Sequence, residues 1–580
     1  MNALFSFKKA YVFVLMFVLS MFIGVVSASA ESWKFGIISD TQWPNSPDNK
    51  NPNSVAVNVI NHLNEEFIAH GVKFVVAVGD VTDNGSNLAL DTRATFAQAL
   101  YNAGIGFYPL RGNHESSKTA AIEFQKIFPQ TQTGVNNQTP LASFVTTTYY
   151  GAPPANTGTT FTVGSNFTSY PAANNGYNGL FYSFDYHNAR FVLMDQFTPT
   201  DGASHSVLDA NQVGWVGMQL QGRRAETHAF VFGHKHLISE NHADTLFGND
   251  PSANPDLQNA FMASLFSNGV RYYMGGHDHM HNRAIVSSPS GTSTVQDIIA
   301  ASDSYKFYIP QNPSNDSKYD NPARETEISQ ELFNVGYYIV TVDGPRVTVD
   351  YYASPNGCNG DCDETYDVIP YTFTKHETFG YSLNGREFLV AQGQPYTNVQ
   401  DSFAGTTAQI LAGYNGSSAS DHIGRAFTKT VDTGWTPKTA GSPKTKDNHS
   451  FEHDDTEERC DSLHLACDDQ DVASDILSLW GMADLGSDQT DTYVLSMTYN
   501  PEKSRPEHLG HGMFGLATRD SNGNWINAVD RNIGGVKKFV MGAWNPSYEL
   551  GTYGVDPGTH TAWAVVNYNS DFVVTRFDQE

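Results

Sequence analysis

Five short polar clusters in this sequence carry residue types that bind metal ions. Each cluster directly follows a short apolar run that predicts a buried strand. In chain order the clusters are Asp40-Thr41-Gln42, Gly79-Asp80, Gly112-Asn113-His114-Glu115, Gly233-His234 and Gly276-His277-Asp278-His279. Aspartate, asparagine and histidine offer oxygen and nitrogen donors that suit transition metals, and no cysteine lies near them, which excludes a thiolate site.

The number of donors favours two metal ions over one. Two aspartates, one asparagine and three histidines exceed what a single tetrahedral zinc with an open position needs. They suit two ions if one carboxylate bridges them, and two-metal sites stabilise the attacking and leaving oxygens of an in-line displacement. Each cluster alone is typical of a turn, so the joint pattern carries the prediction.

The elements around these clusters predict an α/β layered domain. The strand candidates run over residues 34–39, 74–78, 107–110, 230–232 and 270–274, and the helix candidates over 54–70 and 87–102. Two further strands around Asp343-Gly344, over residues 335–352, have the pattern of a hairpin. In α/β sheets, sites form beyond the carboxyl ends of strands, so this topology brings the five clusters together.

The order of the clusters resembles the signature of calcineurin-like metallophosphoesterases, which reads Asp-x-His, Gly-Asp, Gly-Asn-His-Glu/Asp, Gly-His and Gly-His-x-His. The runs Phe181–Asp185 and Phe191–Asp195, and Gln212 three residues before Trp215, are similar to purple-acid-phosphatase-like members. The resemblance covers about residues 33–353. It implies a four-layer αββα sandwich, with two sheets between outer layers of helices.

The resemblance also implies a role for each site residue. Asp80 bridges two metal ions, for which Mn, Fe or Zn are expected. Asp40 and His279 bind the first ion, and Asn113, His234 and His277 bind the second. His114 faces the substrate and protonates the leaving oxygen or stabilises the transition state, while a metal-bridging hydroxide attacks phosphorus. The expected substrates are small phosphate monoesters, diesters or nucleotide pyrophosphates.

Gln42 departs from the family's pattern, which usually has histidine at this position. A carboxamide oxygen can bind a hard cation but is a weaker donor than imidazole. We therefore expect Gln42 to be a metal ligand, and the affinity and identity of the first metal ion stay open. His236 and His281 are further candidates to line the site. For His236, a partly exposed loop position is the alternative.

The chain has 580 residues and a formal net charge of −27, which argues against extended contact with nucleic acid. Two bound metal ions would still give the site a local positive charge that attracts phosphate.

Residues 1–30 have the pattern of a signal peptide: Lys8 and Lys9, an apolar run over 10–26, and Ala28-Ser29-Ala30. The alternative is an uncleaved anchor helix. Cleavage would give a secreted or periplasmic protein without a later membrane span.

Four cysteines follow the signal peptide, and an even number in an exported chain predicts disulfides. The simplest pairing joins Cys358 to Cys362 and Cys460 to Cys467. The alternative is a thiolate metal site, for which closer pairs are usual.

The sequence divides into a catalytic domain over residues 31–353, a linker over 354–370 and a β-rich domain over 371–580. Alternating apolar residues and hairpin signals predict that the last region is an all-β sandwich. Residues 116–179 are rich in Gly, Asn, Thr, Pro and Tyr and predict a long irregular insertion. Because all five clusters end by His279, residues 31–368 are expected to suffice for chemistry.

The leading interpretation is a two-metal phosphoesterase. The alternative is a catalytically decayed secreted binding or adhesion protein, motivated by Gln42 and the large β-rich region. The oligomeric state is left open.

Overall fold

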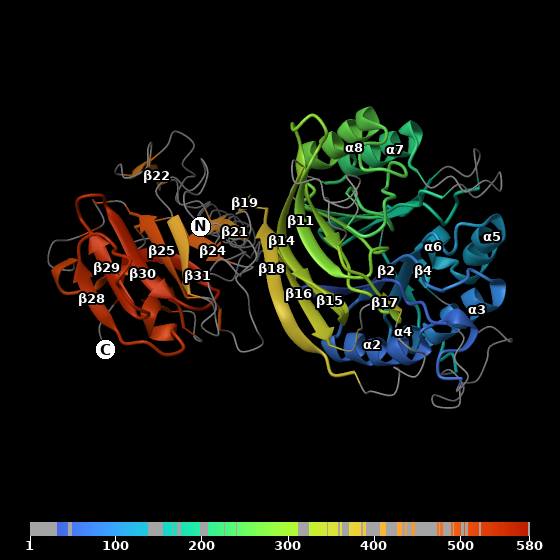
Figure 1. Ribbon diagram of the computed structural model, residues 1–580, viewed down its shortest axis with the longest axis horizontal. Coiled ribbons are helices and arrows are strands. Elements are labelled where there is room, and N and C mark those ends of the chain that lie inside the picture. The colour runs from blue at the N-terminus through green and yellow to red at the C-terminus, as the bar shows by residue number, and fades with distance from the viewer. Residues whose placement is uncertain are drawn as a thin grey trace, which may run out of the picture.

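The computed structural model describes residues 32–136, 155–310, 324–383 and 473–577, each with short gaps, and isolated strands between residues 387 and 446. The helices of the N-terminal region lie on the outer sides of two sheets, and a separate β-rich region contains the C-terminal end of the chain (Figure 1). This is the expected αββα arrangement with a β-rich C-terminal region.

The first sheet has six strands, and the last three in the pairing order below run parallel to one another. In pairing order they are β18 (Thr374–Ser382), β16 (Arg346–Ser354), β15 (Val335–Asp343), β1 (Trp33–Ile38), β2 (Phe74–Val78) and β3 (Gly106–Leu110). Because β1, β2 and β3 are parallel, their carboxyl ends meet at one edge of this sheet.

The second sheet has eight strands. In pairing order they are β14 (Glu325–Glu331), β11 (His281–Ser287), β12 (Thr294–Ile299), β10 (Tyr272–Gly275), β9 (His228–Phe232), β8 (Ala189–Leu193), β7 (Tyr182–Tyr186) and β6 (Thr168–Ser169). Here β8, β9, β10 and β12 are parallel, so their carboxyl ends also share an edge.

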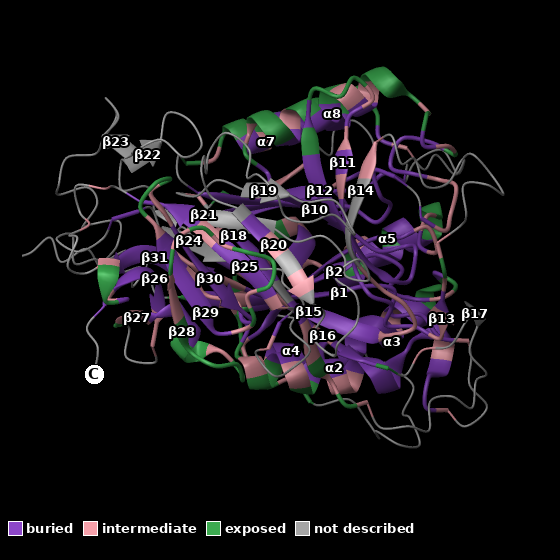
Figure 2. Ribbon diagram, turned by 60° about the vertical axis from the view of Figure 1, so that its left-hand side comes forward, coloured by how far each residue is buried: buried purple, intermediate pink, exposed green. Residues whose placement is uncertain are grey.

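The two sheets pack face to face through an aromatic core. Phe35 and Phe74 from the first sheet lie beside Phe191 from the second, with ring centroids 5.1 Å apart in both pairs. Alternate residues point the other way: Val75 and Ala77 of β2 join the core beneath the helices. Burial on both faces explains the continuous apolar runs of these strands, which are almost entirely buried in Figure 2.

The helices cover the outer faces of the two sheets (Figure 1). They are α2 (Val57–His70), α3 (Asn87–Phe96), α4 (Gln98–Asn102), α5 (Lys118–Ile127), α6 (Gln130–Thr133), α7 (Ala210–Gln221) and α8 (Pro255–Ser267). A capping box between Asp209 and Gln212 fixes the start of α7. The helix expected over residues 87–102 is divided at Ala97.

The prediction of an irregular insertion over residues 116–179 is wrong for the first part of that range. Ser117 caps helix α5 there, and residues of α5 pack into the core. Short strand pairs follow. They are β4 (Val135–Asn136) with β5 (Phe161–Thr162), and, later in the chain, β13 (Lys306–Phe307) with β17 (Gly360–Asp361).

Strand β18 extends the first sheet beyond the boundary expected near residue 353. It pairs antiparallel with β16, and its buried Glu377 accepts hydrogen bonds from His281 Nε2 at 3.0 Å and from Arg283 Nη2. Residues 374–382 therefore belong to the first sheet, and a chain ending at residue 368 would lack one of its strands. The precise domain limits remain a prediction.

The C-terminal region contains two sheets with a shared core, to which Leu495 and Leu516 contribute from opposite sheets. One sheet pairs β19 (Glu387–Leu389), β21 (Ala426–Val431), β24 (Ile476–Leu479), β31 (Asp571–Arg576), β26 (Phe514–Arg519) and β27 (Trp525–Asn527). The other pairs β20 (Thr407–Ala412), β25 (Thr492–Thr498), β30 (Thr561–Val566), β29 (Thr552–Asp556) and β28 (Lys538–Met541), and β22 (Trp435–Pro437) pairs with β23 (Lys444–Lys446).

Several expectations fall on residues outside those described. These are the signal peptide, most of the linker and the four cysteines. Among the residues that are described, no helix has the length and apolar character needed to cross a membrane.

Candidate metal centre

The structure brings the residues expected to bind metal, together with His114, to the edge where the parallel strands of both sheets end. Asp40 follows β1, Asp80 follows β2, and Asn113 and His114 follow β3. His234 follows β9, and His277 and His279 follow β10. Five strands from two sheets thus supply side chains to one place, as their positions in the sequence predict.

The backbone at this edge is folded tightly. Asp40, Asp80, His277 and His279 all have positive φ angles, between 44° and 71°. Such a backbone is costly for residues other than glycine and is typical of functional sites. At Gly112, a Cβ atom would lie only 1.9 Å from Asp80 Oδ1, so glycine is required for the close approach of these loops.

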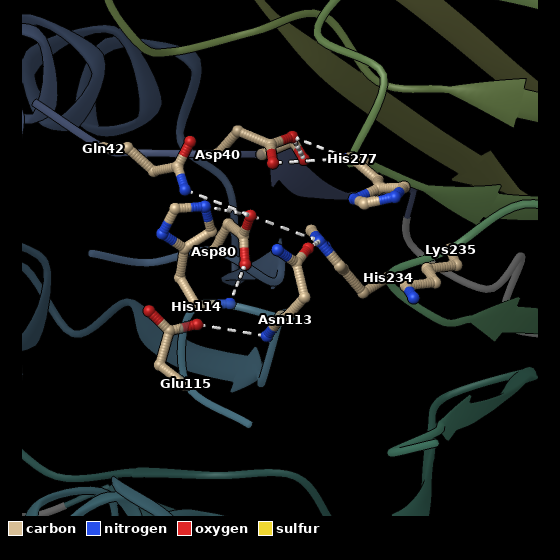
Figure 3. A network of polar contacts seen from close by, with 12 residues as sticks. Asp40, Gln42, Asp80, Asn113, His114, Glu115, His234, Lys235 and His277 are labelled. Atoms are coloured by element: carbon tan, nitrogen blue, oxygen red, sulfur yellow. Dashed lines mark hydrogen bonds and ion pairs between the residues drawn. The ribbon is translucent and has the colours of Figure 1, made fainter. Parts of the chain in front are cut away.

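Asp80 lies at the centre of the cluster (Figure 3). Its Oδ2 accepts a hydrogen bond from Gln42 Nε2 at 3.0 Å and lies 3.4 Å from His234 Nε2, while its Oδ1 accepts from the backbone N–H of His114 at 3.0 Å. Burial opposes ionisation of Asp80, but the positive potential of His234 and His114 outweighs it and holds the pKa well below its ordinary range. Asp80 is thus an ionised carboxylate surrounded by hydrogen-bond donors.

On one side of Asp80 lie Asn113, His234 and His277, here called the Asn113 half. His234 Nδ1 donates to the Val78 carbonyl at 2.9 Å, which turns its Nε2 toward Asp80 and toward Asn113 Oδ1 at 2.9 Å. Burial lowers the pKa of His277 to about 4, which favours the neutral, ligating form of its ring. For His234, burial is outweighed by Asp80 and Asp40, which raise its pKa to about 9.

On the other side lie Asp40, Gln42 and His279, here called the Asp40 half. Burial, with Asp80 adding to it, raises the pKa of Asp40 to about 6. His279 Nε2 is 3.5 Å from Asp40 Oδ1, and its Nδ1 bonds the Lys306 carbonyl at 3.0 Å. Gln42 Oε1 is buried and has no hydrogen-bond partner among the described residues.

These side chains fit two metal ions. The ligand atoms of Asp80, His234 and His277 lie within 4.8 Å of one another, and so do those of Asp40, Asp80 and His279. The two groups share Asp80, as a bridging carboxylate requires. The buried oxygen of Gln42 is a further donor beside them, and backbone carbonyls at the remote nitrogens of His234 and His279 fix which nitrogen faces the cluster.

His114 lies at the rim of this cluster and is partly exposed, with 27% of its side-chain surface accessible. Its Nε2 lies 3.8 Å from Asp80 Oδ2, and its Nδ1 bonds the carbonyl oxygen of Asp83. The carboxylate of Glu115 is buried and accepts from the Thr82 and Gly112 amides, at 3.0 and 3.1 Å. Glu115 therefore ties the loop of Asp80 to the loop of His114.

The two further histidines that the sequence offers as candidates, His236 and His281, do not line the site. His236 is buried and bonds Asp297 Oδ1 at 3.1 Å, so the exposed-loop interpretation is wrong. His281 is buried against Glu377 and Tyr338, with its Nδ1 2.7 Å from the Tyr338 hydroxyl. Both rings instead connect neighbouring strands and loops.

Sequence reasoning missed three residues that lie beside the cluster, His242, Asp244 and Lys306. The His242 ring packs 4.3 Å from the His277 ring, and Asp244 Oδ1 lies 3.2 Å from His277 Nε2. His242 is placed by Asp278, which accepts hydrogen bonds from the backbone of residues 240–242 and from His242 Nδ1. Apart from Asp278 in the last cluster, the sequence holds no motif for them.

Residues 34–281 match a family described as calcineurin-like phosphoesterase. The fold of this N-terminal region and its cluster of donors agree with the match. No curated protein matches the chain.

Among solved structures, PhoD is 12% identical, with 61% of this chain and 70% of that chain covered at a TM-score of 0.37. A dimetal phosphatase from Danio rerio is 14% identical, with coverages of 55% and 95% and a TM-score of 0.30. Purple acid phosphatase PPD1 from yellow lupin (Lupinus luteus) is 14% identical, with coverages of 59% and 57% and a TM-score of 0.33. Likenesses this low carry no functional argument.

Proposed function

We propose that the N-terminal domain hydrolyses phosphate esters with the help of two bound metal ions. The observation that carries the proposal is the pair of ligand groups that share Asp80, beside a partly exposed His114. Asp40, Gln42 and His279 would hold one ion, Asn113, His234 and His277 would hold the other, and Asp80 would contact both. When bound, the ions would supply positive charge to the phosphoryl oxygens.

The protein's own side chains do the remaining work. Asp80 carries a fixed negative charge between the two halves, and the buried backbone around it keeps the donors in place before any ion arrives. His114 donates its Nδ1–H to the Asp83 carbonyl, which leaves Nε2 for the substrate. In the protonated ring, Nε2–H is the proton donor for the leaving oxygen.

The proposal covers small phosphate monoesters, diesters and nucleotide pyrophosphates. We further propose that the protein acts outside the cytoplasm, because residues 1–30 have the pattern of a cleaved signal peptide. The alternative, a catalytically decayed binding or adhesion protein, should have lost several ligands, and the convergence of every expected ligand does not favour it.

The direct test is to strip the protein with a chelator, restore Mn²⁺, and assay monoesters, diesters and nucleotide sugars. We expect no turnover without metal and clear turnover of at least one class with it. A protein that binds no metal stoichiometrically and cleaves none of these esters would contradict the proposal.

The role of His114 is tested separately with His114→Ala. We expect both ions to be retained, because His114 is not a ligand, and turnover of an alkyl phosphate to fall by about a hundredfold or more. An activated aryl phosphate should be affected much less, because its leaving group needs no proton. Loss of metal, or equal slowing of both esters, would remove the proton-donor role.

A further inference from the structure

Lys306 connects two parts of the site that are far apart in the sequence. Its side chain reaches Asp83, with Nζ 2.7 Å from Oδ1, and its carbonyl oxygen accepts a hydrogen bond from His279 Nδ1 at 3.0 Å. Ser302 Oγ also bonds the Lys306 carbonyl, at 2.9 Å. Lys306 lies in β13, so pairing of β13 with β17 holds its backbone in place.

Asp83 holds the ring of His114. Its carbonyl oxygen accepts the Nδ1–H of His114, and its carboxylate lies farther from that nitrogen, with Oδ1 at 4.0 Å. The Asp83 carboxylate is instead engaged by the Lys306 ammonium. His114 Nδ1 thus bonds the neutral carbonyl of Asp83, while the charged carboxylate of the same residue is paired with the lysine.

We infer that Lys306 is a positioning residue for His114. By holding the Asp83 carboxylate away, it keeps the Asp83 carbonyl as the partner of Nδ1 and so keeps Nε2 of His114 directed at the leaving group. This inference rests on the proposed function, since it assigns a role within that reaction.

The step that depends on this geometry is protonation of the leaving oxygen. Water supplies the oxygen of the new bond to phosphorus and loses a proton to solvent. The ester P–O bond breaks, and its electron pair goes to the leaving oxygen. That oxygen takes the proton from His114 Nε2, and the electron pair of the N–H bond stays on nitrogen. A ring that is misplaced even slightly transfers this proton less efficiently.

The site around Lys306 favours positioning over direct binding of substrate. Most of the Lys306 side chain is covered, with 14% of its surface accessible, and its charge is matched by Asp83. Burial opposes the charge of Lys306, but the hydrogen bond that its ammonium donates to the Asp83 carboxylate outweighs burial and holds the pKa of Lys306 above its ordinary value. The lysine therefore stays charged and paired.

The test compares Lys306→Met with Lys306→Arg on an alkyl phosphate and an activated aryl phosphate. We expect Lys306→Met to lower kcat for the alkyl ester by about tenfold or more and to leave KM and aryl ester turnover nearly unchanged. Metal content should stay nearly the same, because the hydrogen bond of His279 is made to the backbone carbonyl of Lys306, which the substitution keeps. Lys306→Arg should restore much of the alkyl ester rate, since it keeps the charge at Asp83.

Two controls separate this role from general damage. Lys126→Met removes a similar lysine–carboxylate pair on α5, with Glu123 at 2.6 Å, and should change neither ester. In a His114→Ala background, Lys306→Met should cause no further loss, because both changes act through one proton transfer. In the metal-free protein, hydrogen exchange should speed up in residues 82–86 for Lys306→Met and not for Lys126→Met.

A rise in KM with kcat unchanged would mean that Lys306 binds substrate, and would overturn the inference. So would additive losses with His114→Ala, equal slowing of both esters, or unchanged exchange in residues 82–86. A wild-type protein without turnover of any phosphate ester would instead overturn the proposed function, and the assigned role of Lys306 with it.

Discussion

The two halves of the metal centre share Asp80 but are built differently. In the Asn113 half, two imidazoles and a carboxamide face Asp80, and His234 is oriented by the Val78 carbonyl behind it. In the Asp40 half, a carboxamide stands in place of a second imidazole: Gln42 Nε2 bonds Asp80, and Gln42 Oε1 has no hydrogen-bond partner among the described residues.

Because their donors differ, the two halves should differ in metal affinity and in metal preference. Imidazole is the stronger donor for transition metals, whereas a carboxamide oxygen favours harder cations. We therefore expect the Asn113 half to bind its ion tightly with little selectivity. The Asp40 half should bind more weakly and prefer Mn²⁺ over Zn²⁺.

The largest effect is expected where the halves meet. Asp80→Asn removes the one negative charge between two cations, so their repulsion is no longer compensated. We expect loss of one or both ions and a fall in turnover of at least about a thousandfold, the upper range for losing one stabilising group at the transition state. Elemental analysis of the variant, together with its turnover rate, tests this expectation. Retention of both ions would show that Asp80 does not bridge the two metal ions.

Exchanging donors between the halves should change their metal affinities in opposite directions. His234→Gln weakens the Asn113 half, and we expect metal affinity or turnover to fall by at least about a hundredfold, because changes to outer partners alone reach that scale. Gln42→His strengthens the Asp40 half, and we expect about tenfold tighter binding with a shift toward Zn²⁺. Calorimetric titration with both metals measures these changes. Equal and opposite effects would mean that the halves are equivalent.

The smallest effect on turnover is expected from removing the residues that follow β18 in the chain. A chain of residues 31–386 keeps Glu377 with Arg283 and should retain most of its turnover. A chain of residues 31–368 lacks β18 and so loses the buried ion pair of Glu377 with Arg283, and we expect it to unfold at a lower temperature than the longer chain. Thermal unfolding of both chains checks this. An inactive but folded 31–386 chain would show that the C-terminal region contributes to the site.

The convergence of the candidate metal ligands could be predicted from sequence because each ligand cluster follows a short apolar run. Strand β2 was predicted with its observed limits, since its alternate residues fill two cores and all of them must be apolar. The convergence of Asp40, Asp80 and His279 then follows from parallel strands.

The parts that could not be predicted depend on contacts between distant segments. Strand β18 has no motif, and only its pairing with β16 and the ion pair of Glu377 place it in the first sheet. His242 stands beside His277 because Asp278 holds its loop, and Lys306 reaches Asp83 across 223 residues of sequence. The burial of His236 could not be predicted, because its partner Asp297 lies in a strand that is distant in the sequence.

The most direct test of a two-ion centre is a titration of the metal-free protein with Mn²⁺, in which bound metal and phosphate-ester turnover are followed together. We expect two ions to bind per chain and turnover to stay low until the weaker site fills. Full turnover with one ion per chain, or two bound ions without any turnover, would contradict it.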